Sequence, residues 1–269
     1  AVRKGRGPGE ILYIDDITIV KDTLFILEAM NRRVIYMAFA DYMNKKQIND
    51  ARVMQLSAGS FLTNMAITEN RYYFSGYLRK GRALAYHRQQ DSYEHWGQVT
   101  NKELEPLMKH LESRVKAVGN YNHMHKKILL GRPGKLMALE AFQDVIRIYD
   151  ETGNLLNERK NTLPPSRIIA IEKNESGVSF QVSKDAVHSY LDACTMGNYV
   201  VTLYSGTPYV EPTSHYGTYI RIFNWEGELL RIFELDRKAN TIAADSENNL
   251  VYATTLDPPQ VIRYKIEMK

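Results

Sequence analysis

The side chains of this sequence that could carry chemistry are a few histidines, aspartates and tyrosines. His123 and His125 alternate along an expected strand, so both imidazoles point to the same face of it. Two imidazoles at this spacing can share a metal ion, although a third ligand would have to come from elsewhere in the chain. A hydrogen-bonded pair at a surface or pocket is the more frequent use of such a motif. Both residues are candidate ligand-binding residues.

Two further pairs contain carboxylates. His188 and Asp192 lie four residues apart in AVHSYLDAC and would face one side of a strand. Such a pair works as a general acid and base only inside a pocket that perturbs its proton affinities, and the sequence shows no pocket. Asp15 and Asp16 precede the first expected strand, where paired carboxylates could hold Ca²⁺. Aspartate is also a frequent turn residue, so a structural role is the alternative for this second pair.

Aromatic side chains are a second group of candidates. The sequence contains 18 Tyr against 8 Phe, and tyrosine suits half-buried strands that end in water or at a pocket. Tyr209 and His215 lie in the polar loop 205–217, SGTPYVEPTSHYG, and are candidate ligand-binding residues. Stacking on a sugar or peptide competes with ordinary packing in an aromatic-rich stretch that contains Tyr72, Tyr73, Tyr77, Tyr86, Tyr93 and Trp96. No Gly-x-Ser-x-Gly, His-Glu-x-x-His or Cys-x-x-Cys motif occurs, so no residue is assigned a catalytic role.

The elements that must position these residues are strands. The stretch IRIYDETGNLL at residues 146–156 returns as IRIFNWEGELL at residues 220–230. In each copy apolar residues alternate with arginine, which is typical of a strand with one buried face. Gly153 and Gly227 stand where a tight hairpin requires a positive φ. The sequence therefore predicts two equivalent hairpins.

A longer pattern, in which an apolar strand, a polar turn and an aromatic strand follow one another, is repeated along the chain. ITIVKDTLFILEAMNRRVIYMAF, MAITENRYYFSGYLRKGRALAYHR and TIAADSENNLVYATTLDPPQVIRYKI share it. Five strand sets are expected, at residues 17–56, 64–100, 121–163, 186–235 and 241–266. An internal repeat of about 45–50 residues, with about four antiparallel strands in each, predicts an all-β propeller. Residues 1–4 are expected to supply the outer strand that the last set lacks.

The remaining segments fit around this repeat. Leucine, methionine and valine recur at helical spacing in residues 102–119, which predicts an amphipathic helix inserted between blades. Residues 164–182 are expected to be a linker with one or two strands. Because repeats stack on their neighbours, residues 1–269 are expected to form a single propeller domain.

Composition excludes several classes of function. The formal charge of +4 is spread along the chain, without the concentrated basic stripe that nucleic-acid binding requires. No apolar run approaches the roughly 18 residues that can span a bilayer. Cys194 is the only cysteine, so no intramolecular disulfide can form, and its apolar surroundings favour a buried, inert thiol.

At this point the sequence resembles a known family. GRGPGE at residues 5–10, LYSG at 203–206, the IFNWEGELL hairpin and the closing NNLVYATTLDPPQVIRYKI are similar to the TolB-like six-bladed β-propellers of Bacteroides-type bacteria. This resemblance implies six blades, whereas five are visible. It also implies a predicted lipoprotein, periplasmic or associated with the outer membrane through a lipid anchor that this sequence does not contain. The chain starts at Ala1 and not at Met, so we expect that a leader was either removed or trimmed.

Three functions compete on these grounds. The favoured one is a non-catalytic binding or scaffold propeller of the bacterial cell envelope, whose blade-end loops and loop 205–217 bind a protein or glycan. The alternative is a metal-dependent hydrolase or lyase with a divalent ion such as Ca²⁺ in the central channel, which needs several converging oxygen ligands. The third is a structural part of an assembly with no small ligand. No cofactor is expected for the favoured function.

Overall fold

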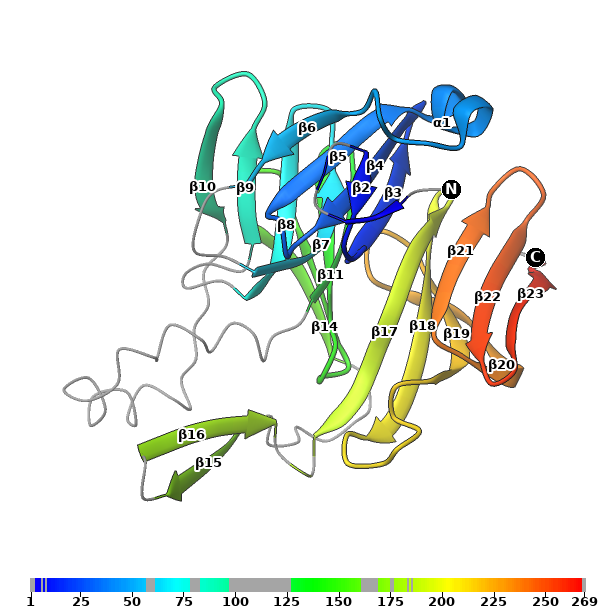
Figure 1. Cartoon of the computed structure of the whole chain (residues 1–269). Helices are drawn as coiled ribbons and strands as arrows, with labels where there is room; N and C mark the ends of the chain where they lie inside the picture. The colour runs from blue at the N-terminus through cyan, green and yellow to red at the C-terminus, as the bar shows by residue number, and fades with distance from the viewer. Residues whose placement is uncertain are drawn as a thin grey trace. The chain divides into compact units, whose positions relative to one another are not determined.

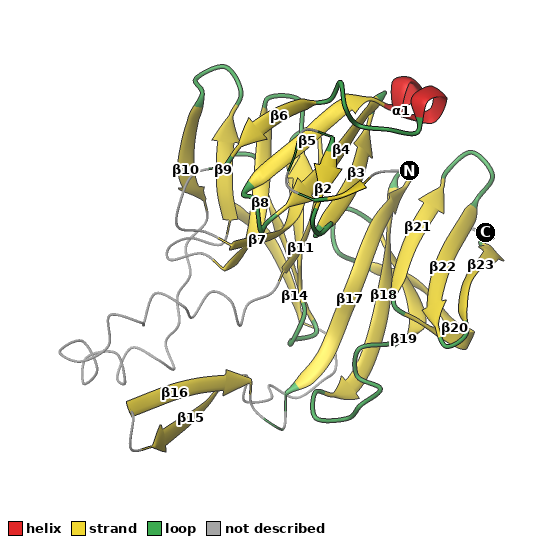
Figure 2. Cartoon of the chain, in the orientation of Figure 1, coloured by secondary structure: helices red, strands yellow, loops and turns green. Residues whose placement is uncertain are grey.

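The computed structural model describes residues 3–5, 7, 9–56, 61–77, 83–96, 127–160, 169–174, 177–182, 184 and 186–267. The fold is an all-β propeller with antiparallel blades, and the described residues form five of them, four with four strands and one with three. Figures 1 and 2 show these strands. Contacts divide the chain into two compact units. Unit 1 contains residues 1–123 with 131–133, and unit 2 contains residues 124–130 with 134–269.

Unit 1 contains two complete blades. A short parallel pair, β1 (Arg3–Lys4) with β2 (Glu10–Ile11), precedes them. Blade 1 consists of β3 (Asp16–Val20), β4 (Thr23–Glu28), β5 (Arg33–Ala38) and β6 (Arg52–Gln55). Blade 2 consists of β7 (Phe61–Ile67), β8 (Arg71–Tyr77), β9 (Ala83–His87) and β10 (Ser92–Trp96).

The other three blades follow in chain order. Blade 3 consists of β11 (Lys127–Arg132), β12 (Lys135–Glu140), β13 (Val145–Tyr149) and β14 (Leu155–Lys160). Blade 4 consists of β17 (Val187–Met196), β18 (Tyr199–Pro208), β19 (Gly217–Phe223) and β20 (Leu229–Ala239). Blade 5 has three strands among the described residues, β21 (Thr241–Asp245), β22 (Leu250–Leu256) and β23 (Pro259–Lys265).

The two near-identical hairpins take equivalent places, as predicted. Each forms the third and fourth strands of its blade, β13–β14 and β19–β20, with a register shift at the same point. Both turns are closed by one side chain, because Asp150 and Asn224 each accept two backbone N–H bonds within the turn. Burial acts to raise the pKa of Asp150, but hydrogen bonds from Thr152 and Asn154 outweigh it and lower the pKa to about 2.

Gly227 makes the second hairpin sensitive to substitution. Its φ is +79°, and a Cβ at this position would lie 2.8 Å from Ile148 Cδ1 of blade 3. Gly134 has the same φ but no neighbour within 4 Å of such a Cβ, so it is a matched control. We expect Gly227→Ala to lower the free energy of unfolding by about 1–2 kcal/mol more than Gly134→Ala does. Chemical denaturation of both variants tests this, and equal losses would contradict it.

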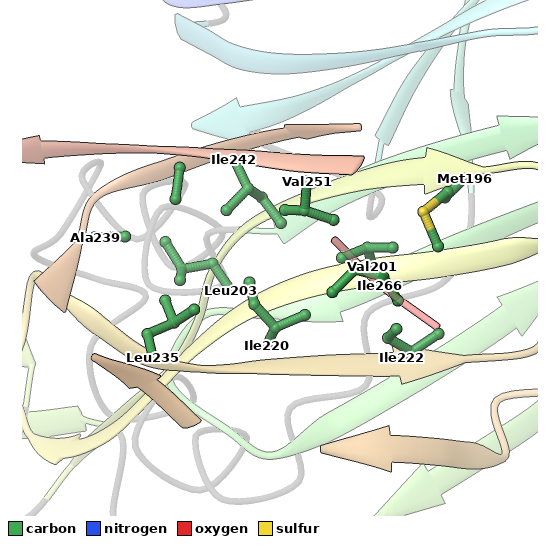
Figure 3. Packing of buried hydrophobic residues seen from close by; sticks show 11 residues of the cluster. Met196, Val201, Leu203, Ile220, Ile222, Leu235, Ala239, Ile242, Val251 and Ile266 are labelled. Atoms are coloured by element: carbon green, nitrogen blue, oxygen red, sulfur yellow. The ribbon is translucent and has the colours of Figure 1, made fainter. Parts of the chain in front are cut away.

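Neighbouring blades bury apolar side chains between them. Within unit 2, Val201, Leu203 and Ile220 of blade 4 face Ile242 and Val251 of blade 5, as Figure 3 shows. All five are no more than 8% exposed. The alternation of strand residues explains this packing, because every second side chain points to the same neighbouring blade. Blades 1 and 2 are joined in the same manner through a cluster that includes Phe25, Leu27, Val34, Met65, Tyr72 and Phe74.

The face of blade 1 that does not pack on blade 2 is covered in part by a short helix. A seven-residue helix, α1 (Phe39–Lys45), connects β5 to β6 and is the one helix among the described residues (Figure 2). Its Phe39 and Tyr42 pack against the buried cluster of Leu24, Ile26, Ile35 and Met37, together with Ile11 and Ile48. The sequence analysis did not predict this helix, because it placed residues 39–45 within the first strand set, 17–56.

Other expectations have mixed outcomes. The predicted helix at 102–119 lies outside the described residues. Among the described strands, β1 pairs with β2, and the sheet of blade 5 contains only β21, β22 and β23, so the expectation that residues 1–4 supply its outer strand is corrected. Within residues 164–182, β15 (Ile169–Asn174) and β16 (Gly177–Val182) pair only with each other among the described strands. The described residues therefore form five blades, whereas the family resemblance implies six.

Candidate functional site

Four aromatic rings gather where blades 3 and 4 meet within unit 2. Phe142 comes from the β12–β13 turn, His188 from the start of β17, and Tyr209 and His215 from the loop between β18 and β19. The His188 ring stacks on Phe142 at 5.1 Å between centroids and meets His215 edge-on at 5.5 Å. The Tyr209 ring lies 5.4 Å from Phe142 and 6.1 Å from His215. We call these four residues the ring cluster.

The side chains of the ring cluster differ in their exposure to solvent. His188 is 6% exposed, Phe142 and Tyr209 are half-buried, and His215 is exposed. Three of the eight candidates from the sequence, His188, Tyr209 and His215, are thus brought together. Phe142 was missed, because nothing in the sequence indicates that a turn of one blade meets the first strand of the next.

Backbone hydrogen bonds hold the segments that carry the rings. The Ser189 amide donates to the Ala141 carbonyl at 2.7 Å, which ties the start of β17 to the β12–β13 turn. The Tyr209 amide donates to Ala186, and two further turns at Glu211 and Ser214 fold the loop on itself. The buried Ser214 hydroxyl donates to the Tyr209 carbonyl at 3.1 Å. The loop 209–216 is therefore a structured presentation surface, with Val210 54% exposed at its tip.

A buried polar network lies two residues further along the same elements. The Asp144 carboxylate accepts hydrogen bonds from the Tyr190 hydroxyl at 2.7 Å, the Tyr204 hydroxyl at 3.1 Å and Arg221 Nη1 at 2.9 Å. The Arg221 guanidinium also lies over the Tyr204 ring, 3.3 Å from its centroid. Asp144 belongs to blade 3 and its partners to blade 4, so this Asp144 network joins the same two blades as the ring cluster.

Burial and the nearby negative charge raise the pKa values of both tyrosines in this network. Burial, reinforced by the Asp144 carboxylate, raises the pKa of Tyr190 well above its ordinary value. The same causes raise the pKa of Tyr204 to about 12. Both phenols therefore stay protonated and act as hydrogen-bond donors to Asp144 at any physiological pH. These hydrogen bonds fix the positions of the side chains in the network.

The duplicated arginines have different partners. Arg147 of the first hairpin pairs with Glu140 and Glu158 of its own blade. Arg221, its counterpart, instead pairs with Asp144 of the preceding blade. The repeat was visible in the sequence, but this exchange of an intrablade partner for an interblade one was not.

Asp16 and Asp192 each connect their blade to the next one through a hydrogen bond. Asp16 Oδ2 accepts the Met65 amide of blade 2 at 2.8 Å, and the Asn64 side chain at 2.9 Å. Asp192 Oδ2 accepts the Ile242 amide of blade 5 at 2.7 Å. Each aspartate lies on the first strand of its blade and binds the first strand of the next blade. We call these contacts the carboxylate links.

The remaining candidates are placed as follows. The Asp15 carboxylate accepts the Ala29 amide at 2.7 Å; burial raises its pKa, and this hydrogen bond acts in the opposite direction. The Asp192 carboxylate accepts the Ile242 amide of blade 5, whereas His188 belongs to the ring cluster, so the contacts of this pair lie in different places. His123 and His125 lie outside the described residues. Among the described residues, no group of three or more His, Cys, Asp or Glu side chains is arranged to hold a metal ion.

Cys194 and the tyrosine-rich stretch have packing roles. Burial raises the pKa of the Cys194 thiol, and the Asp192 charge acts in the same direction. In unit 1, Tyr72 and Tyr73 are no more than 4% exposed and belong to the interior of blade 2. Tyr86 and Tyr93 are half-buried, with ring centroids 4.9 Å apart.

The arrangement defines a class of protein, an all-β propeller with an aromatic and imidazole cluster at an interblade junction. The chain belongs to the TolB-like 6-blade propeller-like family, whose model matches residues 1–247. No curated protein matches the sequence. No helix among the described residues is long and apolar enough to cross a membrane.

Solved structures show similarity at low sequence identity. BamB from Moraxella catarrhalis is 10% identical, with a TM-score of 0.47, and the match covers 94% of this chain and 58% of that one. The Pan2 WD40 domain of Neurospora crassa is 10% identical, with a TM-score of 0.47 and coverage of 94% and 66%. A functionally unknown protein from Desulfotomaculum acetoxidans is 11% identical, with a TM-score of 0.47 and coverage of 91% and 64%. The chain thus spans about three fifths to two thirds of the length of these proteins.

Proposed function

We propose that this protein is a non-catalytic binding propeller of the bacterial cell envelope, periplasmic or outer-membrane-associated, and that its ligand is another protein. The binding surface is formed by the exposed part of the ring cluster and by the loop 209–216. The observation that carries the proposal is a half-exposed group of aromatic rings on a rigid interblade junction, next to an exposed apolar loop tip. Membership of the TolB-like family and the resemblance to predicted lipoproteins support the proposed cellular location.

The chemistry of this surface suits a protein ligand. Aromatic side chains contribute a large contact area at low entropic cost and are enriched where proteins bind one another. Tyr209 and His215 each combine an apolar ring with a hydrogen-bonding group, and Val210 adds an exposed aliphatic contact. The Asp144 network and the Ser189–Ala141 bond hold the supporting strands, so little ordering would be needed on binding.

Site-specific crosslinking tests this proposal. A photoreactive benzoylphenylalanine in place of Val210 is expected to give discrete adducts with an envelope extract, because position 210 lies at the loop tip. Val53 on β6 is a matched control, since it is another exposed valine, 52% exposed compared with 54%. Adding Tyr209→Ala and His215→Ala to the position-210 variant should remove the adducts if the ring cluster contributes to recognition.

Three results would contradict the proposal. Equal adducts from positions 53 and 210 would mean non-specific contact. Adducts that survive the double substitution would place recognition elsewhere. Turnover of an ester, lactone or glycoside by the purified protein, lost on chelation, would favour the metal-dependent enzyme. A glycan array provides the remaining comparison, because a specific glycan hit without a protein adduct would change the ligand class.

A further inference from the structure

We propose that His188 and His215 form a binding site for a borderline transition-metal ion, Cu²⁺, Ni²⁺ or Zn²⁺. The site lies within the ring cluster, but it goes beyond the proposed function because metal binding requires no protein partner. The two imidazoles supply the protein ligands, and the open coordination positions are filled by solvent or by a donor atom of a bound partner.

The separation of the two rings carries this inference. Their centroids lie 5.5 Å apart and their planes are at 89°. Two imidazoles that bind one tetrahedral ion through nitrogens at about 2.0–2.1 Å have centroids roughly 5 Å apart. The observed pair is within a few tenths of an ångström of that spacing, so the separation of the two rings is compatible with binding of one ion by both imidazoles. Rotation about each metal–nitrogen bond leaves the angle between the ring planes unrestricted.

The surroundings fix one ligand and leave the other accessible. His188 is clamped by the Phe142 ring, which stacks on it with an interplanar angle of 21°, and by the edge of Tyr209. His215 is exposed, so an ion can approach from solvent. The folded loop that carries His215 is held by the Ser214 and Tyr216 backbone bonds. Such preorganisation lowers the entropic cost of bringing two ligands to one ion.

The donor set selects the class of ion. Imidazole nitrogen suits Zn²⁺, Cu²⁺ and Ni²⁺, whereas Ca²⁺ and Mg²⁺ prefer oxygen ligands. Affinity for such a site follows the order Ni²⁺ below Cu²⁺ and Cu²⁺ above Zn²⁺. The site therefore differs in position and in chemistry from a Ca²⁺ site built on Asp15 and Asp16.

Calorimetric titration of the untagged full chain with Cu²⁺ and Ni²⁺ tests this inference. We expect one ion per chain at micromolar concentration, and no heat of binding with Ca²⁺. His215→Ala should weaken binding at least tenfold, because it removes an exposed ligand. His95→Ala is the matched control, since His95 is also exposed but lies on β10 of blade 2, and it should leave the affinity unchanged. Unchanged circular dichroism and Tm should show that both variants fold.

Two results would overturn the inference. One is binding that His215→Ala leaves unchanged, and the other is no binding of Cu²⁺ below about 1 mM. If affinity is instead lost in His123→Ala with His125→Ala and kept in His215→Ala, the metal site belongs to that pair and the inference is wrong. The crosslinking experiment at position 210 is made without added metal, so its outcome separates failure of this inference from failure of the proposed function.

Discussion

Asp144→Ala is expected to lower the free energy of unfolding of unit 2 by about 3–5 kcal/mol, because it breaks a buried ion pair on one side only. The Asp144 side chain is 1% exposed and that of Arg221 is 15% exposed, so water cannot replace the lost carboxylate well. The substitution also removes the acceptor of the Tyr190 and Tyr204 hydroxyls. Buried donors without partners add to the cost of the uncompensated charge.

The two tryptophans make this loss measurable in the correct unit. Trp96 lies in unit 1 and Trp225 in unit 2, and each is 2% exposed. In a Trp96→Phe background, the fluorescence of Trp225 during urea denaturation reports on the part of the chain that contains the Asp144 network. Tyr190→Phe, which removes one hydrogen bond and keeps the ion pair, should cost about 1 kcal/mol.

A second substitution separates charge from packing. Adding Arg221→Leu to Asp144→Ala removes the unpaired cation, so the double variant should regain about 1–3 kcal/mol relative to Asp144→Ala alone. The exposed Asp236, which accepts the Tyr264 hydroxyl at 2.6 Å, is the control carboxylate. A loss for Asp144→Ala no larger than that for Asp236→Ala would show that the interblade network has no special energetic role.

Asp192→Ala is expected to have the next largest effect, about 1.5–3 kcal/mol, because a charged acceptor is removed from a main-chain donor between blades. Its carboxylate binds the Ile242 amide at 2.7 Å and the Ala193 amide at 2.9 Å. Asp16→Ala should have a similar effect in unit 1, where Asp16 binds the Met65 amide. Asparagine retains one acceptor oxygen, so Asp192→Asn should cost less than Asp192→Ala.

Hydrogen exchange localises this second effect. The Ile242 amide should lose protection in Asp192→Ala, and the Met65 amide should lose it in Asp16→Ala, each beyond the change in global stability. Asp41→Ala, on the exposed side of α1, is the control and should alter neither amide. If Ile242 stays fully protected in Asp192→Ala, the carboxylate link is replaceable by other contacts and the estimate of its energy is wrong.

The strands were predictable because their signals are local. Alternation of apolar residues and the turn residues Gly153 and Gly227 depend on sequence neighbours only, and the duplicated hairpins confirmed the propeller. Helix α1 was missed because FADYMNK follows an apolar strand without a break. Its packing on Leu24 and Ile26, and not a local propensity, explains why this segment becomes a helix.

The candidate site was predictable only in part, because it is assembled across blades. Tyr209 and His215 were singled out as members of a long polar loop, and His188 as a chemically capable residue. The residues that they meet are distant in the chain: Phe142 lies 46 positions before His188, and Asp144 lies 46 positions before Tyr190. Asp16 and Asp192 were predicted to be ligand-binding residues for a similar reason, because the sequence does not show that the amide of a distant strand donates a hydrogen bond to each carboxylate.

The carboxylate links have a consequence for how such a chain can be rebuilt. Each aspartate binds a main-chain amide, so the side chain at position 65 or 242 is free to change as far as the link is concerned. Proline is the exception, because it has no amide hydrogen to donate. Whole blades could therefore be exchanged between relatives at these junctions, provided that the incoming first strand does not place proline opposite the aspartate.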